Sequence, residues 1–343
     1  MTDATGIASG SIQLNQPASS TTVTATFTTD TNYSGASASK AFTVSQEDAS
    51  LEYTGDTIGV TNVNMTLEAT VKDSAAASYL PTSPNPEPGG TIGDITKMWI
   101  RFDFNSGMNC GGTTSMTPKY VRVVDTGAVG DGIGTARSTF TSSSDSVYCV
   151  VATLVASASG GTNTWYTASP SQPATVVFYN NYGQFVTGGG WITDPNANRG
   201  NFGFNARYNK SGQPQGQMVY VYRDLYSGPC TINGVAQTCT NVPATYVIKS
   251  NSLTALGFTG KVYPIKANLS GGATLQVNRA SDGASIFSEG GGTFDATVTD
   301  TGTSSGIGLD DYSLTFTKKS GTSPFKYVPT SLLKGGNVVI HLQ

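Results

Sequence analysis

Short runs in which apolar and polar residues alternate follow one another along the chain. The run Thr21–Thr28 (TTVTATFT), for example, places Val23, Ala25 and Phe27 on one face. A period of two residues is typical of a β-strand with one buried face. Comparable runs, separated by Gly, Asn, Asp and Ser, are Lys40–Ser45, Val63–Lys72, Lys97–Phe104, Ser146–Val155, Ala174–Tyr179, Gln217–Arg223 and Tyr312–Thr317. Because no continuous helical stripe interrupts these runs, the pattern predicts an all-β chain of the sandwich type.

The composition agrees with a folded β protein rather than with a disordered one. Charged residues make up 12% of the chain, about half of the ordinary level, yet aromatic residues reach 10% and supply core material. Thr, Val and Tyr are frequent, and they suit a pleated, half-buried surface. A chain of 343 residues is long enough for two or three domains with separate cores.

Charge and hydropathy exclude several classes of partner. A net charge of −3 and an isoelectric point near 5.1 argue against nucleic acid and anionic membranes, which need a basic face. The sequence holds no apolar run of the about 18 residues that a membrane span needs. Because the N-terminus lacks a signal-peptide pattern, we expect either a removed signal or a chain cut from a longer protein.

Four cysteines, Cys110, Cys149, Cys230 and Cys239, form no C-x-x-C pair. With one histidine in the chain, a zinc site is implausible. An even number of cysteines in a loop-rich β protein favours disulfides and an oxidising compartment. Three connectivities are possible, and proximity in the sequence favours Cys110–Cys149 and Cys230–Cys239.

The second cysteine pair also predicts a hairpin register. The dipeptide Asn233–Gly234 alone suggests a two-residue turn, which sets Cys230 opposite Gln237. A four-residue loop over Asn233–Ala236 instead sets Cys230 opposite Cys239, within the Cα separation of about 4.4–6.8 Å that a disulfide allows. We therefore expect the four-residue loop.

The segment Thr21–Thr57 resembles the junction between tandem bacterial Ig-like repeats of large surface proteins. In such repeats a Thr-Ala-Thr-Phe strand leads into an Asp-Asn-Tyr turn, and a Phe-Thr-Val strand then precedes Glu-Asp-x-x-Leu-x-Tyr-Thr-Gly-Asp. Thr29 stands where the family usually has Gly. The matching residues are Asp30, Asn32, Tyr33, Phe42, Val44, Glu47, Asp48, Tyr53, Gly55 and Asp56.

A second resemblance begins at Gly188. The motifs Gly188–Ile192 (GGGWI), Gly200–Tyr220 and Lys334–Leu342 (KGGNVVIHL) look like a β-domain that closes such proteins after their repeats. Together the two resemblances imply Ig-like β-sandwiches in tandem with a C-terminal antiparallel β-sandwich domain. They also imply an extracellular or cell-surface location.

These motifs divide the chain into three parts. Residues 1–46 hold about three strands, fewer than the roughly seven of an Ig sandwich, and are expected to be the C-terminal part of a truncated repeat. Residues 47–181 are expected to form a complete Ig-like domain, with the Pro-rich stretch Pro81–Pro88 as a loop within it. Residues 182–343 are expected to form the C-terminal sandwich.

The sequence offers no set of catalytic motifs that fit one active site. Gly302–Gly306 fits G-x-S-x-G, but a nucleophile elbow needs a strand-to-helix turn and a histidine base. The only histidine, His341, alternates with Ile340 and Leu342 on the last strand and is expected to face solvent. Without a convergent acid, base and nucleophile, we expect a protein that is not an enzyme.

Calcium is the best-motivated small ligand. Asp300, Asp310 and Asp311 flank the Gly-containing loop Thr301–Leu309. Calcium takes six to eight oxygen ligands from carboxylates and loop carbonyls. The alternative is that these aspartates simply begin turns.

Aromatic residues offer a second candidate site. Tyr208, Tyr220 and Tyr222 lie on strand-like runs and are candidates for a sugar-stacking platform. Such rings more often fill the core of a sandwich.

Two functions follow from these observations. The first is a non-catalytic structural or adhesive protein, in which Ig-like spacers present a terminal β-domain to other surface proteins, a host or environmental surface, or a glycan. Residues 1–46 add possible self-association, because Val23, Ala25, Phe27, Phe42 and Val44 form a face that strand exchange between molecules would cover, giving a fibre if repeated. The alternative is a carbohydrate-binding region of a larger secreted enzyme.

Overall fold

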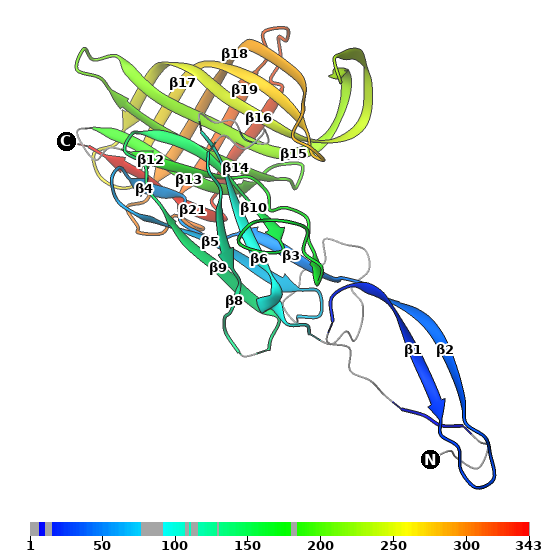
Figure 1. Cartoon of the computed structure of the whole chain (residues 1–343). Helices are drawn as coiled ribbons and strands as arrows, with labels where there is room; N and C mark the ends of the chain where they lie inside the picture. Colours follow the sequence, from blue (N-terminus) through cyan, green and yellow to red (C-terminus); the bar gives the residue numbers. More distant parts are fainter. Residues whose placement is uncertain are drawn as a thin grey trace.

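The computed structural model describes residues 7–10, 16–76, 92–106, 110, 116–128, 130–179 and 184–342. Apart from one short 3-10 helix, η1 (Ile95–Lys97), the regular structure in these ranges is strand, divided among four sheets (Figure 1). The all-β prediction is therefore confirmed. Within the same ranges no helix has the length and apolar character that a membrane crossing requires.

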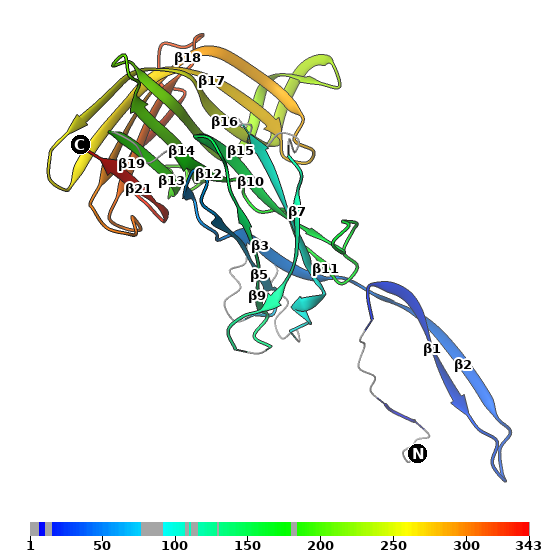
Figure 2. The same ribbon diagram turned by 60° about the vertical axis from the view of Figure 1, so that its left-hand side comes forward.

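A two-stranded hairpin projects from the rest of the molecule (Figures 1 and 2). It consists of β1 (Ser19–Phe27) and β2 (Ala36–Val44), paired antiparallel so that Val23 lies opposite Lys40. This register places Val23, Ala25, Phe27, Phe42 and Val44 on one face, which they share with Lys40 and which we call the hairpin face. Because no described sheet packs over it, Val23 is 47% and Phe27 45% exposed.

The second part is a sandwich of two five-stranded sheets, which we call the central sandwich. One sheet has the order β4-β12-β10-β6-β7 and the other β11-β3-β5-β9-β8. The strands are β3 (Glu47–Tyr53), β4 (Ile58–Val60), β5 (Met65–Asp73), β6 (Trp99–Ser106), β7 (Lys119–Arg122), β8 (Val124–Asp125), β9 (Ile133–Phe140), β10 (Ser146–Val155), β11 (Tyr166–Thr167) and β12 (Ala174–Tyr179).

Alternation along the strands builds the core of the central sandwich. In β5, Met65, Leu67, Ala69 and Val71 are buried, and the residues between them are partly exposed. They pack in one cluster with inward residues of β6, β10 and β12 such as Phe102. Two sheets that each bury one face against the other satisfy the apolar faces of both.

The C-terminal part is one continuous antiparallel sheet of nine strands, in the order β20-β19-β18-β17-β16-β15-β14-β13-β21. The strands are β13 (Phe185–Thr193), β14 (Arg199–Tyr208), β15 (Pro214–Ile232), β16 (Val235–Thr259), β17 (Ile265–Arg279), β18 (Ser285–Asp300), β19 (Asp311–Thr317), β20 (Lys326–Leu332) and β21 (Gly335–His341). We call it the C-terminal sheet.

This sheet curls around its own core (Figures 1 and 2). Side chains from all nine strands share one buried cluster, and β18 contacts β21 across the interior. The long strands bend at bulges, for instance between Ser250 and Ser252 and between Leu253 and Ala255. An extra residue on one strand bends and twists a sheet, and these bulges therefore permit the curl.

Both predicted disulfides are present, but the predicted hairpin register was wrong. Cys230 lies opposite Gln237 and Ile232 opposite Val235, which leaves a two-residue Asn233–Gly234 turn. Positive φ angles of 53° and 80° at these two residues suit a type I′ turn. Cys230 and Cys239 are diagonal neighbours on one face, with their Cα atoms 5.8 Å apart. The register is regular from Gly228 opposite Cys239 to the turn, and the disulfide therefore joins diagonal neighbours without direct opposition.

Candidate functional site

The junction between the central sandwich and the C-terminal sheet contains an apolar contact. β10 and β12 turn their inner faces to the sandwich core, and their outer faces meet β13, β14 and β15, with Val247 of β16 in the same buried cluster. The contacting side chains, which we call the junction cluster, are fully or almost fully buried. They are Cys110, Val147, Cys149, Val177, Val219, Val221 and Val247.

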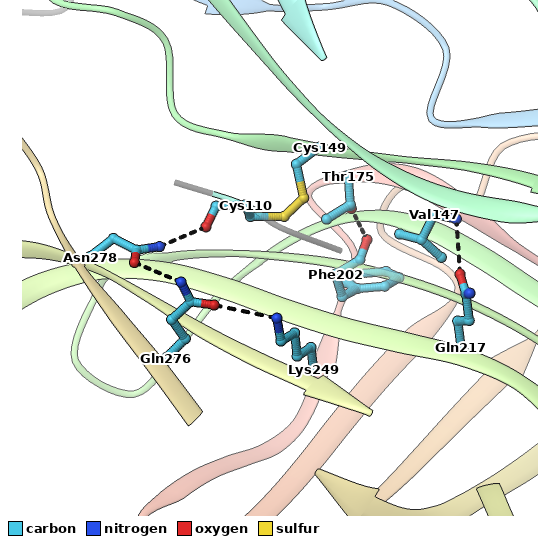
Figure 3. The surroundings of a disulfide bond; sticks show 9 residues. All are labelled: Cys110, Val147, Cys149, Thr175, Phe202, Gln217, Lys249, Gln276 and Asn278. Atoms are coloured by element: carbon cyan, nitrogen blue, oxygen red, sulfur yellow. Dashed lines mark hydrogen bonds between the residues drawn. A yellow bond between two sulfur atoms is a disulfide. The ribbon is translucent and has the colours of Figure 1, made fainter. Parts of the chain in front are cut away.

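The disulfide Cys110–Cys149 lies inside the junction cluster (Figure 3). Its two Cα atoms are 5.1 Å apart, and both side chains are fully buried. In the chain-entropy model, closing a loop over a sequence separation of 39 stabilises the fold by roughly 4 kcal/mol. The bond therefore fixes Cys110 against β10 at the contact with the C-terminal sheet.

Polar groups at this junction have partners on the opposite domain (Figure 3). The Asn278 Nδ2 of β17 donates to the Cys110 carbonyl at 3.1 Å, and the Val147 amide donates to Gln217 Oε1 at 3.2 Å. The Thr175 hydroxyl donates to the Phe202 carbonyl. Buried polar groups without partners are costly, so these pairs specify one docking geometry in addition to the apolar contact.

Charged pairs line the rim of the junction. Arg207 of β14 contacts Asp145 at 3.0 Å, and Arg199 contacts Glu52 while its guanidinium lies 4.4 Å from the centre of the Trp191 ring. These side chains are partly exposed. Pairs of this kind contribute about 0–1 kcal/mol each, and they orient the junction more than they stabilise it.

A cavity of about 270 Å³ opens beside the Asp145–Arg207 pair. The rings of Tyr179 and Phe185 lie 4.9 Å apart in its wall, and burial raises the pKa of Tyr179. Asn205 and Gln217 add amide groups to the lining. An aromatic wall with a few convergent polar groups is the usual make-up of a small-molecule pocket.

The three tyrosines of the sequence-based ligand platform do not form a platform. Tyr220 and Tyr222 are 0% and 4% exposed, because even-numbered residues of this stretch of β15 face the core of the C-terminal sheet. The Tyr222 ring stacks on Tyr246 at 4.7 Å. Tyr208 is 39% exposed, and its hydroxyl donates to the Leu256 carbonyl. Tyr220 and Tyr222 are therefore core residues of the C-terminal sheet.

Two of the three predicted metal ligands accept hydrogen bonds from the backbone. Asp300 Oδ2 accepts from the Ile340 amide at 2.7 Å, and Asp310 Oδ2 accepts from the Val338 amide at 3.0 Å. Their second oxygens accept from the Gly302 and Thr301 amides. Burial, and to a smaller extent the charge of Asp310, raise the pKa of Asp300.

These carboxylates cap an open sheet edge. β21 pairs with β13 on one side, and no described strand pairs with its other side. Val338 and Ile340 direct their amides to that side, where Asp310 and Asp300 accept them. Asp311 begins β19 and lies opposite Leu332. The described ranges hold no group of three or more His, Cys, Asp or Glu side chains arranged for a metal, and the calcium site stays a prediction.

The G-x-S-x-G run Gly302–Gly306 lies between two strands, β18 and β19, and not in the strand-to-helix turn of a nucleophile elbow. His341 is exposed, and its ring stacks on Phe185 at 5.3 Å.

No protein-family model matches the chain, and no curated protein matches its sequence. The junction, the cavity and the hairpin face are therefore the features from which we infer a function.

Substitution of Asp310 distinguishes edge capping from calcium binding. In Asp310→Ala the buried amides of Thr301 and Val338 lose their acceptor, and we expect the free energy of unfolding to fall by about 1–3 kcal/mol with or without EDTA. The matched variant Asp311→Ala should change it by less than about 0.5 kcal/mol. Chemical denaturation of the three proteins measures both effects. Calcium in this loop predicts a different result, in which EDTA destabilises the wild type and both substitutions abolish the effect of EDTA.

Proposed function

We propose that the chain is a non-catalytic structural or adhesive protein of the cell surface or extracellular space. In this proposal the central sandwich is an Ig-like spacer that holds the C-terminal sheet in a fixed orientation. The junction cluster is the observation that carries the proposal. Domains joined through small polar contacts move relative to one another, whereas this contact is apolar and contains a disulfide.

Two further features support this function. Both disulfides suit an oxidising, extracellular compartment. The buried carboxylates Asp300 and Asp310 are engaged by backbone amides, which is a structural use of acidic groups. The candidate partners are other surface proteins, a host or environmental surface, or a glycan.

A charge in the junction cluster tests whether the two domains act as one mechanical unit. Val219 is fully buried, on the outer face of the C-terminal sheet. In Val219→Asp the domains must separate to hydrate the carboxylate, and we expect the docking to lose about 3 kcal/mol or more. Calorimetry should then show two unfolding transitions in place of one, and small-angle scattering a larger radius of gyration.

The control for this variant is Val235→Asp, at a position that is 62% exposed. It adds the same charge far from the junction cluster and should leave both measurements unchanged. If Val219→Asp also behaves like the wild type, the stiff-junction proposal is wrong.

The hairpin face supports self-association as a part of this function. An apolar sheet face with Val23 and Phe27 about half exposed gains free energy when another apolar face covers it. Open strand edges on both sides of a hairpin also accept further strands. We propose a second copy of the chain as the covering partner.

Light scattering after size-exclusion chromatography, over a range of concentrations, measures this association. We expect the wild type to form dimers or longer assemblies, and the double variant Val23→Ser, Phe27→Ser to remain monomeric. Thr22→Ser with Thr26→Ser changes the opposite, polar face of β1 and should associate as the wild type does. A wild type that stays monomeric at the highest concentration contradicts strand exchange between copies.

The alternative function, a carbohydrate-binding module of a larger secreted enzyme, is favoured by the cavity beside Asp145. A ring face and paired charged or amide groups are suited to a sugar ring and its hydroxyls. A glycan array with the wild type identifies a ligand. Asp145→Asn and Gln215→Ala should then weaken its binding by about tenfold each, since each removes about one charge-assisted or neutral hydrogen bond. Binding that both variants leave intact places the sugar elsewhere.

A further inference from the structure

Five large apolar side chains are exposed where three connections of the C-terminal sheet meet. Val262 and Tyr263 lie in the turn between β16 and β17, Ile307 and Leu309 in the loop between β18 and β19, and Leu332 at the end of β20. Val262 is 80% exposed, and the other four side chains are 49–56% exposed. We call these five residues the apolar end patch. Exposed apolar side chains that gather in one place, unlike single scattered ones, mark an interaction site.

Contacts between the three connections hold the patch together. Gly302 lies so close to the Tyr263 ring that a side chain at this glycine would collide with it. The Tyr263 hydroxyl donates to the Ile340 carbonyl at 3.3 Å, and the Gly308 amide donates to the Leu333 carbonyl at 2.8 Å. The β18–β19 loop is thus fixed to the β16–β17 turn on one side and to the end of β20 on the other. Both views place this turn and this loop on the side of the molecule away from the hairpin of β1 and β2 (Figures 1 and 2).

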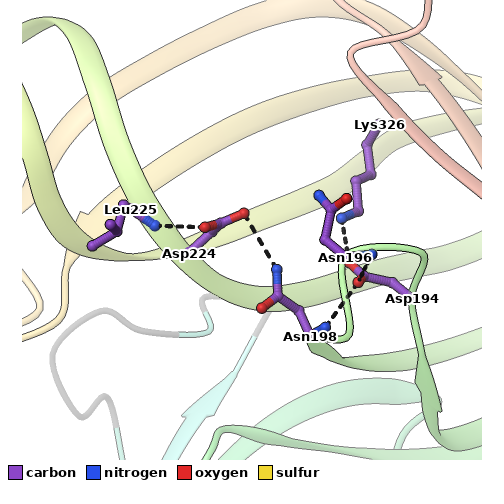
Figure 4. Close-up of polar contacts among 6 residues, drawn as sticks. All are labelled: Asp194, Asn196, Asn198, Asp224, Leu225 and Lys326. Atoms are coloured by element: carbon purple, nitrogen blue, oxygen red, sulfur yellow. Dashed lines mark hydrogen bonds and ion pairs between the residues drawn. The ribbon is translucent and has the colours of Figure 1, made fainter.

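Three lysines lie within three positions of a patch residue in the sequence. Lys261, Lys266 and Lys334 are exposed, and none of them forms an ion pair with another described residue. The lysine at the other end of β20 differs, because the Nζ of Lys326 is buried against Asp194 Oδ2 (Figure 4). The charges of the three lysines beside the patch are therefore open to a ligand, whereas that of Lys326 is used inside the fold.

The acidic groups beside the patch are mostly buried. Asp300 and Asp310 are 3% and 0% exposed, and backbone amides donate to both oxygens of each carboxylate. Asp311 is partly exposed. The surface around the patch therefore carries three lysines against one aspartate, although the net charge of the whole chain is −3. The charge of the whole chain, which argues against an anionic membrane, does not describe this part of the surface.

We propose that the apolar end patch docks on the surface of a lipid bilayer that contains anionic lipids. The side chains of Val262, Ile307, Leu309 and Leu332 enter the boundary between headgroups and acyl chains. Tyr263 lies at the headgroup level, where amphipathic rings are enriched. The lysines contact anionic headgroups, each with about fivefold gain in affinity. Interfacial binding of this kind grows with the apolar area buried and with the electrostatic attraction.

A second copy of the chain would complement this surface less well. Pairing of two apolar end patches brings Lys261 and Lys334 of one copy near the same lysines of the other, and juxtaposed like charges oppose association. Anionic headgroups carry the opposite charge. The patch also stays accessible when another molecule covers the hairpin face, because the two lie on different sides of the molecule (Figures 1 and 2). This inference names the surface to which the proposed adhesive protein attaches, and it rests on that proposed function.

Sedimentation of the full chain with lipid vesicles tests the proposal. We expect the wild type to bind vesicles of phosphatidylcholine with phosphatidylglycerol, and to bind them about tenfold more tightly than vesicles of phosphatidylcholine alone. Added salt should weaken the binding. Val262→Ser with Ile307→Ser should weaken it by about tenfold or more on both vesicles, because less apolar area is buried. Lys261→Gln with Lys334→Gln should weaken it by about tenfold on the anionic vesicles alone.

Two controls make the same changes elsewhere. Val235→Ser alters an apolar side chain that is 62% exposed, and Lys319→Gln removes an exposed charge beyond the end of β19. Both should bind vesicles as the wild type does, and all of these positions are exposed, so that the fold is retained. A wild type that sediments with neither vesicle overturns the proposal. So does a change of oligomeric state in Val262→Ser with Ile307→Ser without vesicles, which assigns the patch to a second copy. Domain docking is measured separately with Val219→Asp, so that either proposal can fail while the other stands.

Discussion

The burial of β10, β12 and β15 on both faces is the constraint on which the rest of the structure depends. Each strand gives one face to the core of its own domain and the other to the junction cluster. If the domains separate, Val177 and Val219 become surface residues on two large sheets. Apolar area of this kind costs about 25 cal/mol per Å² when it is exposed to water. Docking therefore stabilises both domains. The Cys110–Cys149 disulfide lies within the junction cluster, at the contact between them.

The edge strand β21 and the hairpin of β1 and β2 differ in how their open edges are protected. At the edge of the C-terminal sheet, the carboxylates of Asp300 and Asp310 accept the amides of Val338 and Ile340 in β21, so these two amides are not available to a further strand. The hairpin of β1 and β2 has neither caps nor a covering sheet among the described residues. Open edges are templates for further strands. The two edges thus differ in the backbone amides that they leave available to a further strand.

The sequence predicted the all-β fold and both cysteine pairs, because alternation and sequence proximity are local signals. It did not predict the register at Cys230, since diagonal neighbours in a hairpin with a two-residue turn also satisfy the Cα separation of a disulfide. The role of Asp310 was equally hidden. Val338, whose amide donates to Asp310, is 28 residues away in the sequence, and only the curl of the sheet brings the two together. The alternation of side chains along a strand places Tyr220 and Tyr222 on the same face, as observed. Alternation alone does not say which of the two faces is buried.

One signal for the junction is nevertheless present in the sequence. In β5 (MTLEATVKD) buried residues alternate strictly with partly exposed ones, as expected for a strand with one buried face. The stretches VYCV in β10, TVVF in β12 and MVYVY in β15 are apolar or small at consecutive positions, and each is buried throughout. A strand with apolar residues at both odd and even positions is buried on both faces. Loss of alternation in strands from two domains therefore indicates where those domains dock, and it points to β10, β12 and β15 without any knowledge of the fold.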